Sequence, residues 1–240
     1  MSHRDSSPTT FRIELDGEGH IVGDHAEGDR PGYMFLHGLG SVRQSEKSDS
    51  LLQHAGRRGV AFTRCDFRGH GESTGTIGQV TIGELIDDTV RLLDRFGPTV
   101  IVGSSLGGLV GAFATARRPD LVAGLGLIAP AFGFVSRLER AIDADGQLWT
   151  SNGRAFPLAR RVLDDARQLD ERGLPGRISV PTLIVHGDAD EVVSHSHSRR
   201  FFDAVAAERK RLWIVPGGDH RLSEVRQSMW QRLDELLGNS

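Results

Sequence analysis

The residues with the clearest chemical potential lie where a short apolar run meets a cluster of small residues. The run from Thr99 to Val102 is apolar and β-branched, which is typical of a buried strand. It continues into a Gly-x-Ser-x-Gly sequence centred on Ser105, and a helical pattern follows from Leu109 to Arg117. A serine on such a strand-to-helix turn has an exposed hydroxyl, so Ser105 is a candidate nucleophile.

A second Gly-x-Ser-x-Gly sequence is centred on Ser73. No apolar strand runs directly into it, and the polar stretch from Thr76 to Thr81 follows it in place of a helix. We therefore interpret Ser73 as a turn residue. Because the motif alone is weak evidence, the assignment of Ser105 depends on partner groups elsewhere in the chain.

A serine hydroxyl is a weak nucleophile at neutral pH and needs a neighbouring base, which is itself oriented by an acid. His220 follows the last apolar run, Arg211–Val215, through a glycine-containing turn. A loop at that position can carry the imidazole over Ser105, so His220 is the predicted base. The acid candidates all lie in the loop after the predicted strand Thr182–His186; they are Asp188, Asp190 and Glu191.

Acyl transfer also requires hydrogen-bond donors for the oxygen that becomes negatively charged. The backbone N–H of Leu106, directly after the serine, is one predicted donor. The second is the N–H of Leu39, because Gly38 and Gly40 allow the backbone to turn inward there. This interpretation makes His37, which opens the same loop, a structural residue.

Two further histidines, His195 and His197, could form a metal site with Asp188 and Asp190. The His-Ser-His spacing at a helix start places the two rings on different faces, and no other ligands converge in the sequence. We therefore predict no metal site, and the proposed chemistry requires no cofactor.

Composition restricts the class of protein. The chain has 240 residues, 38% hydrophobic and 25% charged, with a net charge of −3 and one cysteine. These values fit a single soluble domain without disulfides and give no reason to expect nucleic acid as a partner. No signal-peptide pattern opens the chain and no apolar run is long enough to span a bilayer, so we expect a cytoplasmic protein.

Apolar runs alternate with helical patterns along the chain, which predicts an α/β fold with a mostly parallel, doubly wound sheet. We expect one domain over residues 1–240. The alternation is interrupted at 130–180, which we interpret as a helical cap insertion with helices near Arg137–Ala144 and Leu158–Asp170. Such a cap would lie over the C-terminal edge of the sheet, where α/β proteins bind ligands.

The predicted cap is rich in aromatic residues. Phe132, Phe134, Trp149 and Phe156 could form an apolar pocket for an acyl group, and we name the first three as substrate contacts. The alternative is that these rings only pack the cap against the sheet.

The ordered motifs are similar to those of a known family. The chain resembles the α/β-hydrolase superfamily over nearly its whole length, through His37–Gly40, Asp66–Ser73, Gly103–Gly107, His186–Asp190 and Gly218–His220. Within that superfamily it is most similar to the small palmitoyl-protein thioesterase and acyl-glucuronide esterase group, and to bacterial serine-aminopeptidase-like esterases.

The resemblance implies an α/β-hydrolase fold and a catalytic triad of Ser105, Asp190 and His220, with Leu39 and Leu106 as the oxyanion donors. It implies a hydrolase that acts on small-molecule esters or thioesters through a covalent acyl-enzyme. Two alternatives stay open at this stage. One is cleavage of amide or C–C bonds on the same scaffold, and the other is a binding protein without catalysis.

Overall fold

The computed structural model describes residues 7–17, 19–149 and 153–238, without the side chains at positions 135, 137, 139 and 140. The strands are β1 (Thr9–Glu14), β2 (His20–Ala26), β3 (Asp29–Leu36), β4 (Val60–Cys65), β5 (Thr99–Ser104), β6 (Val122–Ile128), β7 (Gln147–Trp149), β8 (Ala155–Pro157), β9 (Thr182–Gly187) and β10 (Lys210–Val215). The α-helices are α1 (Glu46–Arg58), α2 (Ile82–Phe96), α3 (Leu106–Arg117), α4 (Phe134–Ala141), α5 (Arg160–Ala166), α6 (His195–Ala204) and α7 (Arg226–Leu237).

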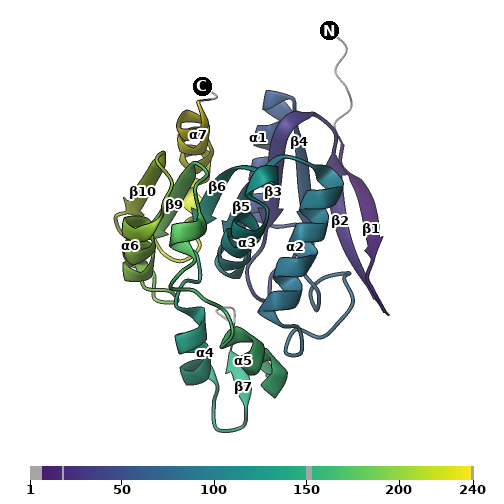
Figure 1. The fold of residues 1–240 in the computed structure, drawn as a ribbon, viewed down its shortest axis with the longest axis vertical. Helices are drawn as coiled ribbons and strands as arrows, with labels where there is room; N and C mark the ends of the chain where they lie inside the picture. Colours follow the sequence, from purple (N-terminus) through teal and green to yellow (C-terminus); the bar gives the residue numbers. More distant parts are fainter. Residues whose placement is uncertain (1–6, 18, 150–152, 239–240) are drawn as a thin grey trace.

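Eight strands form one twisted sheet in the order β1-β2-β4-β3-β5-β6-β9-β10 (Figure 1). Strands β4, β3, β5, β6, β9 and β10 pair in parallel, whereas β1 and β2 add an antiparallel edge. The predicted α/β class with a mostly parallel, doubly wound sheet is confirmed. Because the six parallel strands run the same way, the loops after β3, β5, β9 and β10 meet at one edge.

Helices cover both faces of this sheet and bury its apolar side chains in two clusters. Leu51 of α1 and Trp230 of α7 pack with Phe35 and Val102 on one face. Helices α2, α3 and α6 pack against the other face in a separate cluster. The strands are therefore apolar on both sides, as continuous apolar runs in the sequence predict. None of the described helices is both long and apolar enough to cross a membrane.

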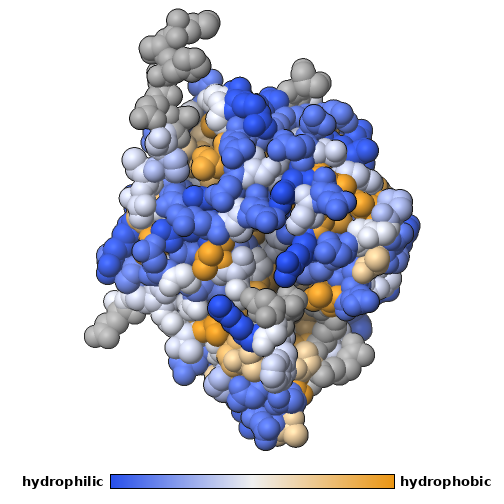
Figure 2. All heavy atoms as spheres, turned by 180° about the vertical axis from the view of Figure 1, so that it is seen from behind, coloured by the Kyte–Doolittle hydropathy of each residue, from blue (hydrophilic) through white to orange (hydrophobic). Residues whose placement is uncertain are grey.

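The segment between β6 and β9 leaves the sheet and forms a lobe below its C-terminal edge, with α4, α5 and β7 in it (Figure 1). We call this lobe the cap. In it α4 begins at Phe134, earlier than the predicted start at Arg137, and α5 is shorter than predicted. Strands β7 and β8 pair as an antiparallel hairpin that the sequence did not predict. On the face shown in Figure 2, the surface is largely hydrophilic and hydrophobic residues gather around this lobe at the bottom of the view.

Side chains cap the starts of two helices. A capping box opens α2, with Thr81 and Glu84 exchanging side-chain to backbone hydrogen bonds. Helix α6 begins at His195, where the Ser194 hydroxyl accepts a hydrogen bond from Ser196 N–H.

The fold predicts that glycine is required where α3 passes β3. An added Cβ at Gly107 would lie 2.2 Å from the Leu36 carbonyl oxygen, which is backbone and cannot rotate away. We expect Gly107→Ala to lower the free energy of unfolding by more than about 2 kcal/mol, measured by urea denaturation. Gly176→Ala is the matched control, since an added Cβ there meets nothing within 4 Å. Equal stability of the two variants would contradict the predicted clash between α3 and β3.

Candidate active site

Ser105 occupies the turn between β5 and α3 with a backbone conformation that is rare for a residue with a side chain. Its φ is 54° and its ψ is −116°. Its own N–H donates to the Ile128 carbonyl oxygen at 2.9 Å, and its carbonyl oxygen accepts from Ala131 N–H at 3.0 Å. These bonds to the end of β6 and the residues after it hold the strained turn in place. The turn predicted from the Gly-x-Ser-x-Gly sequence is therefore present.

The glycines of the motif allow the sharp turn because three backbone segments cross there. An added Cβ at Gly103 would lie 2.3 Å from the Gly107 carbonyl oxygen. An added Cβ at Gly38, in the loop after β3, would lie 3.3 Å from the Ser105 Cβ. The loop that contains Leu39 thus passes directly beside the serine.

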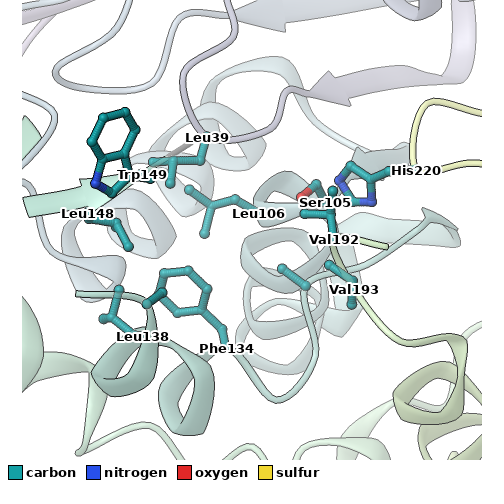
Figure 3. Close-up of a pocket in the computed structure, with 12 residues that line it drawn as sticks. Leu39, Ser105, Leu106, Phe134, Leu138, Leu148, Trp149, Val192, Val193 and His220 are labelled. Atoms are coloured by element: carbon teal, nitrogen blue, oxygen red, sulfur yellow. The ribbon is translucent and has the colours of Figure 1, made fainter. Parts of the chain in front are cut away.

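The loops after β9 and β10 bring an acid and an imidazole together beside this turn. Asp190 Oδ2 accepts a hydrogen bond from His220 Nδ1 at 2.7 Å. Since Nδ1 is the donor, Nε2 of the same ring is free to accept a proton. In Figure 3 the Ser105 hydroxyl and the His220 ring lie side by side, and both residues line one cavity. The structure therefore brings Ser105, Asp190 and His220 to the same edge of the sheet.

The Asp190 carboxylate is fully buried and has a donor for each oxygen. Oδ1 accepts from the N–H groups of Val192 and Val193, both at 2.8 Å, and Oδ2 accepts from His220 and from His186. Burial alone would raise the pKa of Asp190, but the hydrogen bonds from His186, His220 and Val193 hold that pKa well below its usual range. Asp190 is thus an ionised acceptor at neutral pH.

His186 is a part of the site that the sequence pattern did not single out. Its side chain is fully buried at the end of β9, and its Nε2 donates to Asp190 Oδ2 at 3.1 Å and to the Val193 carbonyl oxygen at 2.9 Å. Its Nδ1 lies 2.7 Å from the Ser198 hydroxyl of α6, which donates to it when the ring is neutral. His186 therefore fixes the position of the Asp190 carboxylate and is itself fixed by Ser198. In the sequence, its place at a predicted strand end and at the start of the His186–Asp190 segment gave a signal, but neither assigned it a role.

The alternatives considered for the acid and the nucleophile have other contacts. Asp188 Oδ1 accepts from Gly217 N–H at 2.7 Å, so this carboxylate supports the turn that precedes His220. The Ser73 hydroxyl is buried, donates to the Asp66 carbonyl oxygen at 2.7 Å and accepts from Val22 N–H at 2.9 Å. Ser73 therefore ties the loop after β4 to β2.

Two neutral histidines hold the loop that contains Leu39. His37 Nε2 accepts from Phe67 N–H at 3.0 Å, so its Nδ1 carries the proton and donates to the Gly38 carbonyl oxygen at 2.8 Å. His70 Nε2 accepts from Gly40 N–H at 3.0 Å. In a trans peptide the C=O and N–H point in opposite directions, so the Leu39 N–H points away from the His37 ring.

The cavity beside Ser105 has a volume of about 220 Å³ and is mostly apolar. Its apolar lining extends from the serine towards β7 and includes Leu39, Leu106, Phe134, Leu138, Leu148 and Trp149 (Figure 3). Of the residues proposed as substrate contacts, Phe134 and Trp149 line this cavity. Four further lining residues were not singled out as substrate contacts by the sequence pattern; they are Leu138, Leu148, Val192 and Val193.

Phe132, also proposed as a substrate contact, is not among the described residues that line the cavity. Its ring stacks on Phe201 of α6 with centroids 4.0 Å apart and planes inclined by 9°, and it is only 5% exposed. Phe156 packs inside the cap with Leu138 and Leu148. These two rings therefore pack within the protein, as the alternative interpretation of the sequence expected.

The chain matches known proteins over most of its length. The family model described as "Serine aminopeptidase, S33" matches residues 32–163 and 158–224. The mouse mitochondrial palmitoyl-protein thioesterase ABHD10 is 28% identical over 213 residues, which cover 82% of this chain and 71% of that protein. The solved structure of mouse ABHD10 superposes with a TM-score of 0.82 at 24% identity, covering 95% of this chain and 99% of the other.

A bacterial structure is equally similar in fold. Est1E from Butyrivibrio proteoclasticus, with ferulic acid bound, has a TM-score of 0.81 at 21% identity and covers 95% of this chain and 99% of its own. The sheet order, the Ser105 turn and these matches define an α/β-hydrolase. The chain belongs to the serine aminopeptidase S33 family within that superfamily.

The contacts of His186 predict a positioning effect on turnover. In His186→Gln and Ser198→Ala, Asp190 loses the fixed geometry of one charge-assisted hydrogen bond. We expect kcat on a short ester to fall about tenfold with KM unchanged. His195→Gln is the matched control, since His195 does not contact Asp190 in the structure. A fall in thermal stability without a fall in kcat would contradict the positioning role.

The buried His37 predicts a pH-dependent stability. Burial, together with the nearby His70, lowers the pKa of His37 to about 4. Below about pH 6.5 this histidine binds a proton in the unfolded chain, whereas in the folded chain it does so only near pH 4. The free energy of unfolding therefore falls as the pH falls from about 6.5 to 4, by up to about 3 kcal/mol. Urea denaturation from pH 7 to 4 should show this slope, and His37→Gln should flatten it. An unchanged slope in the variant would contradict the assignment.

Proposed function

We propose that this protein hydrolyses carboxylic esters or thioesters with an apolar acyl group, through a covalent acyl-enzyme on Ser105. The observation that carries the proposal is the 2.7 Å bond between His220 Nδ1 and Asp190 Oδ2, on a ring that lies beside the Ser105 hydroxyl (Figure 3). A serine, a histidine and a buried carboxylate in this arrangement can generate a nucleophile at neutral pH. The names of the relatives, a palmitoyl-protein thioesterase and a protein with ferulic acid bound, support the same chemistry.

The proposed reaction has two halves. His220 Nε2 removes the proton from Ser105 Oγ as the oxygen attacks the acyl carbon, and His220 then protonates the leaving alcohol or thiol. The carbonyl oxygen becomes negative and binds the N–H groups of Leu39 and Leu106, which remain ordered by the His37 bond and by the start of α3. In the second half, His220 activates water, which releases the acid from Ser105.

The cavity supports an ester or thioester rather than a peptide substrate. An aminopeptidase must bind a free amino group, and among the described residues that line the cavity there is no carboxylate to pair with one. Phe134, Leu138, Leu148 and Trp149 instead offer an apolar surface to an acyl chain.

The proposal predicts a large effect of the serine and of the histidine. Ser105→Ala and His220→Ala should each lower kcat on a p-nitrophenyl ester by about 10⁴-fold or more, and Asp190→Asn somewhat less. Ser73→Ala is the control, because the loss of its two buried hydrogen bonds affects stability rather than kcat. Labelling by a fluorophosphonate should disappear in Ser105→Ala, fall strongly in His220→Ala, which lacks the base that activates the serine, and persist in Ser73→Ala. Retained turnover and labelling in Ser105→Ala would overturn the proposal.

The same assay separates substrate classes. Across a series of acyl esters and thioesters, kcat/KM should rise by up to about fourfold per methylene while the chain still enters the cavity, since each buried CH₂ contributes about 0.8 kcal/mol. Aminoacyl arylamides should be much poorer substrates. Faster cleavage of the arylamides than of the esters would favour a peptidase instead.

A further inference from the structure

A second cavity, with a volume of about 310 Å³, lies at the same edge of the sheet as the first. The same three loops line both cavities with residues that are neighbours in the chain. Leu39, Ser105 and His220 line the apolar cavity, whereas Gly38, Ser104 and Arg221 line the second one. Ser105 lines the first cavity, and Ser104, the residue directly before it, lines the second.

The second cavity differs from the first in its chemistry. Two cationic side chains, Lys47 of α1 and Arg221, line it together with the serines at 41, 45, 104 and 223. Within the described part of the chain, neither Lys47 nor Arg221 forms an ion pair. Cations and hydroxyl donors that face a common space are a setting in which an anion is bound.

The acidic groups nearby have other partners. Glu46 also lines the cavity, but its carboxylate forms an ion pair with Arg226. Asp219 lies near enough to favour the charged form of Lys47, and its Oδ1 accepts from the N–H groups of Arg221 and Leu222. Burial, with the neighbouring Arg226 and Arg221, nevertheless lowers the pKa of Lys47.

We propose that this second cavity binds an anionic group, a carboxylate or a phosphate, on the leaving alcohol or thiol of the substrate. The inference rests on the proposed function and extends it. An ester carbon held at Ser105 carries an acyl chain and a leaving group, and the apolar cavity suits the acyl chain. His220 must protonate the leaving group, and Arg221 is the next residue after His220, so the leaving group lies on the side of the cationic cavity.

Three esters with the same hexanoyl group test the proposal. Their alcohols are glycolamide, which is neutral, glycolate, which carries a carboxylate, and ethylene glycol monophosphate. In Lys47→Met and in Arg221→Met, kcat/KM for at least one of the two charged esters should fall about tenfold more than for the glycolamide ester, as expected for the loss of one charge-assisted contact. The charged ester that shows this loss identifies the group. Inorganic phosphate should inhibit the wild-type enzyme and inhibit both variants less.

Arg211→Gln is the matched control, because it removes one positive charge near the other end of β10, where Arg211 pairs with Glu235. The kcat/KM of this variant should equal that of the wild type for all three esters. Equal losses for charged and neutral esters in Lys47→Met and Arg221→Met, or no loss for any, would overturn the anion site. That result is distinct from failure of the proposed function, in which the wild type would not hydrolyse the glycolamide ester either, or Ser105→Ala would retain activity.

Discussion

The hydrogen bonds to the buried Asp190 carboxylate are the constraint on which the rest of the site depends. A carboxylate without exposure to water is costly unless every oxygen has donors, and here two backbone N–H groups and two imidazoles supply them. The loop after β9 must therefore curl back on itself so that Val192 and Val193 can donate. The same requirement fixes His220 at 2.7 Å and sets which of its nitrogens faces the serine.

The opposite side of the site is positioned by backbone rather than by charge. Ser105 remains at a positive φ because Gly103 and Gly107 allow α3 to start close to β5 and β3. His37 and His70, both neutral, hold the adjoining loop through its C=O and N–H groups. The donors proposed for the oxyanion are thus arranged before a substrate binds, which is the condition under which such donors contribute most to catalysis.

The two cavities give the site a chemical asymmetry. The cap supplies Phe134, Leu138, Leu148 and Trp149 to an apolar space on one side of the serine, while Lys47 and Arg221 line a polar space beside it. Because segments outside the eight-stranded sheet provide these groups, the scaffold can keep its reactive centre while its substrate preference changes. This separation is consistent with the variety of activities among proteins of the same fold.

The sequence by itself determined the alternation of strands and helices, the parallel sheet and the turn at Ser105, because these depend on local periodicity and on glycine spacing. It also placed His220 after the last strand, since chain order restricts where such a loop can lie. It left Asp188, Asp190 and Glu191 open on chemical grounds, and the resemblance to a family favoured Asp190.

The tertiary structure alone decided which carboxylate contacts the imidazole, that His186 shares it, and that Phe132 packs on Phe201 rather than lining the cavity. It also showed the β7–β8 hairpin and the cationic cavity, to which three separate loops contribute. Each of these depends on contacts between segments that are distant in the chain. Such contacts follow from how the whole chain packs, and local residue patterns do not encode them.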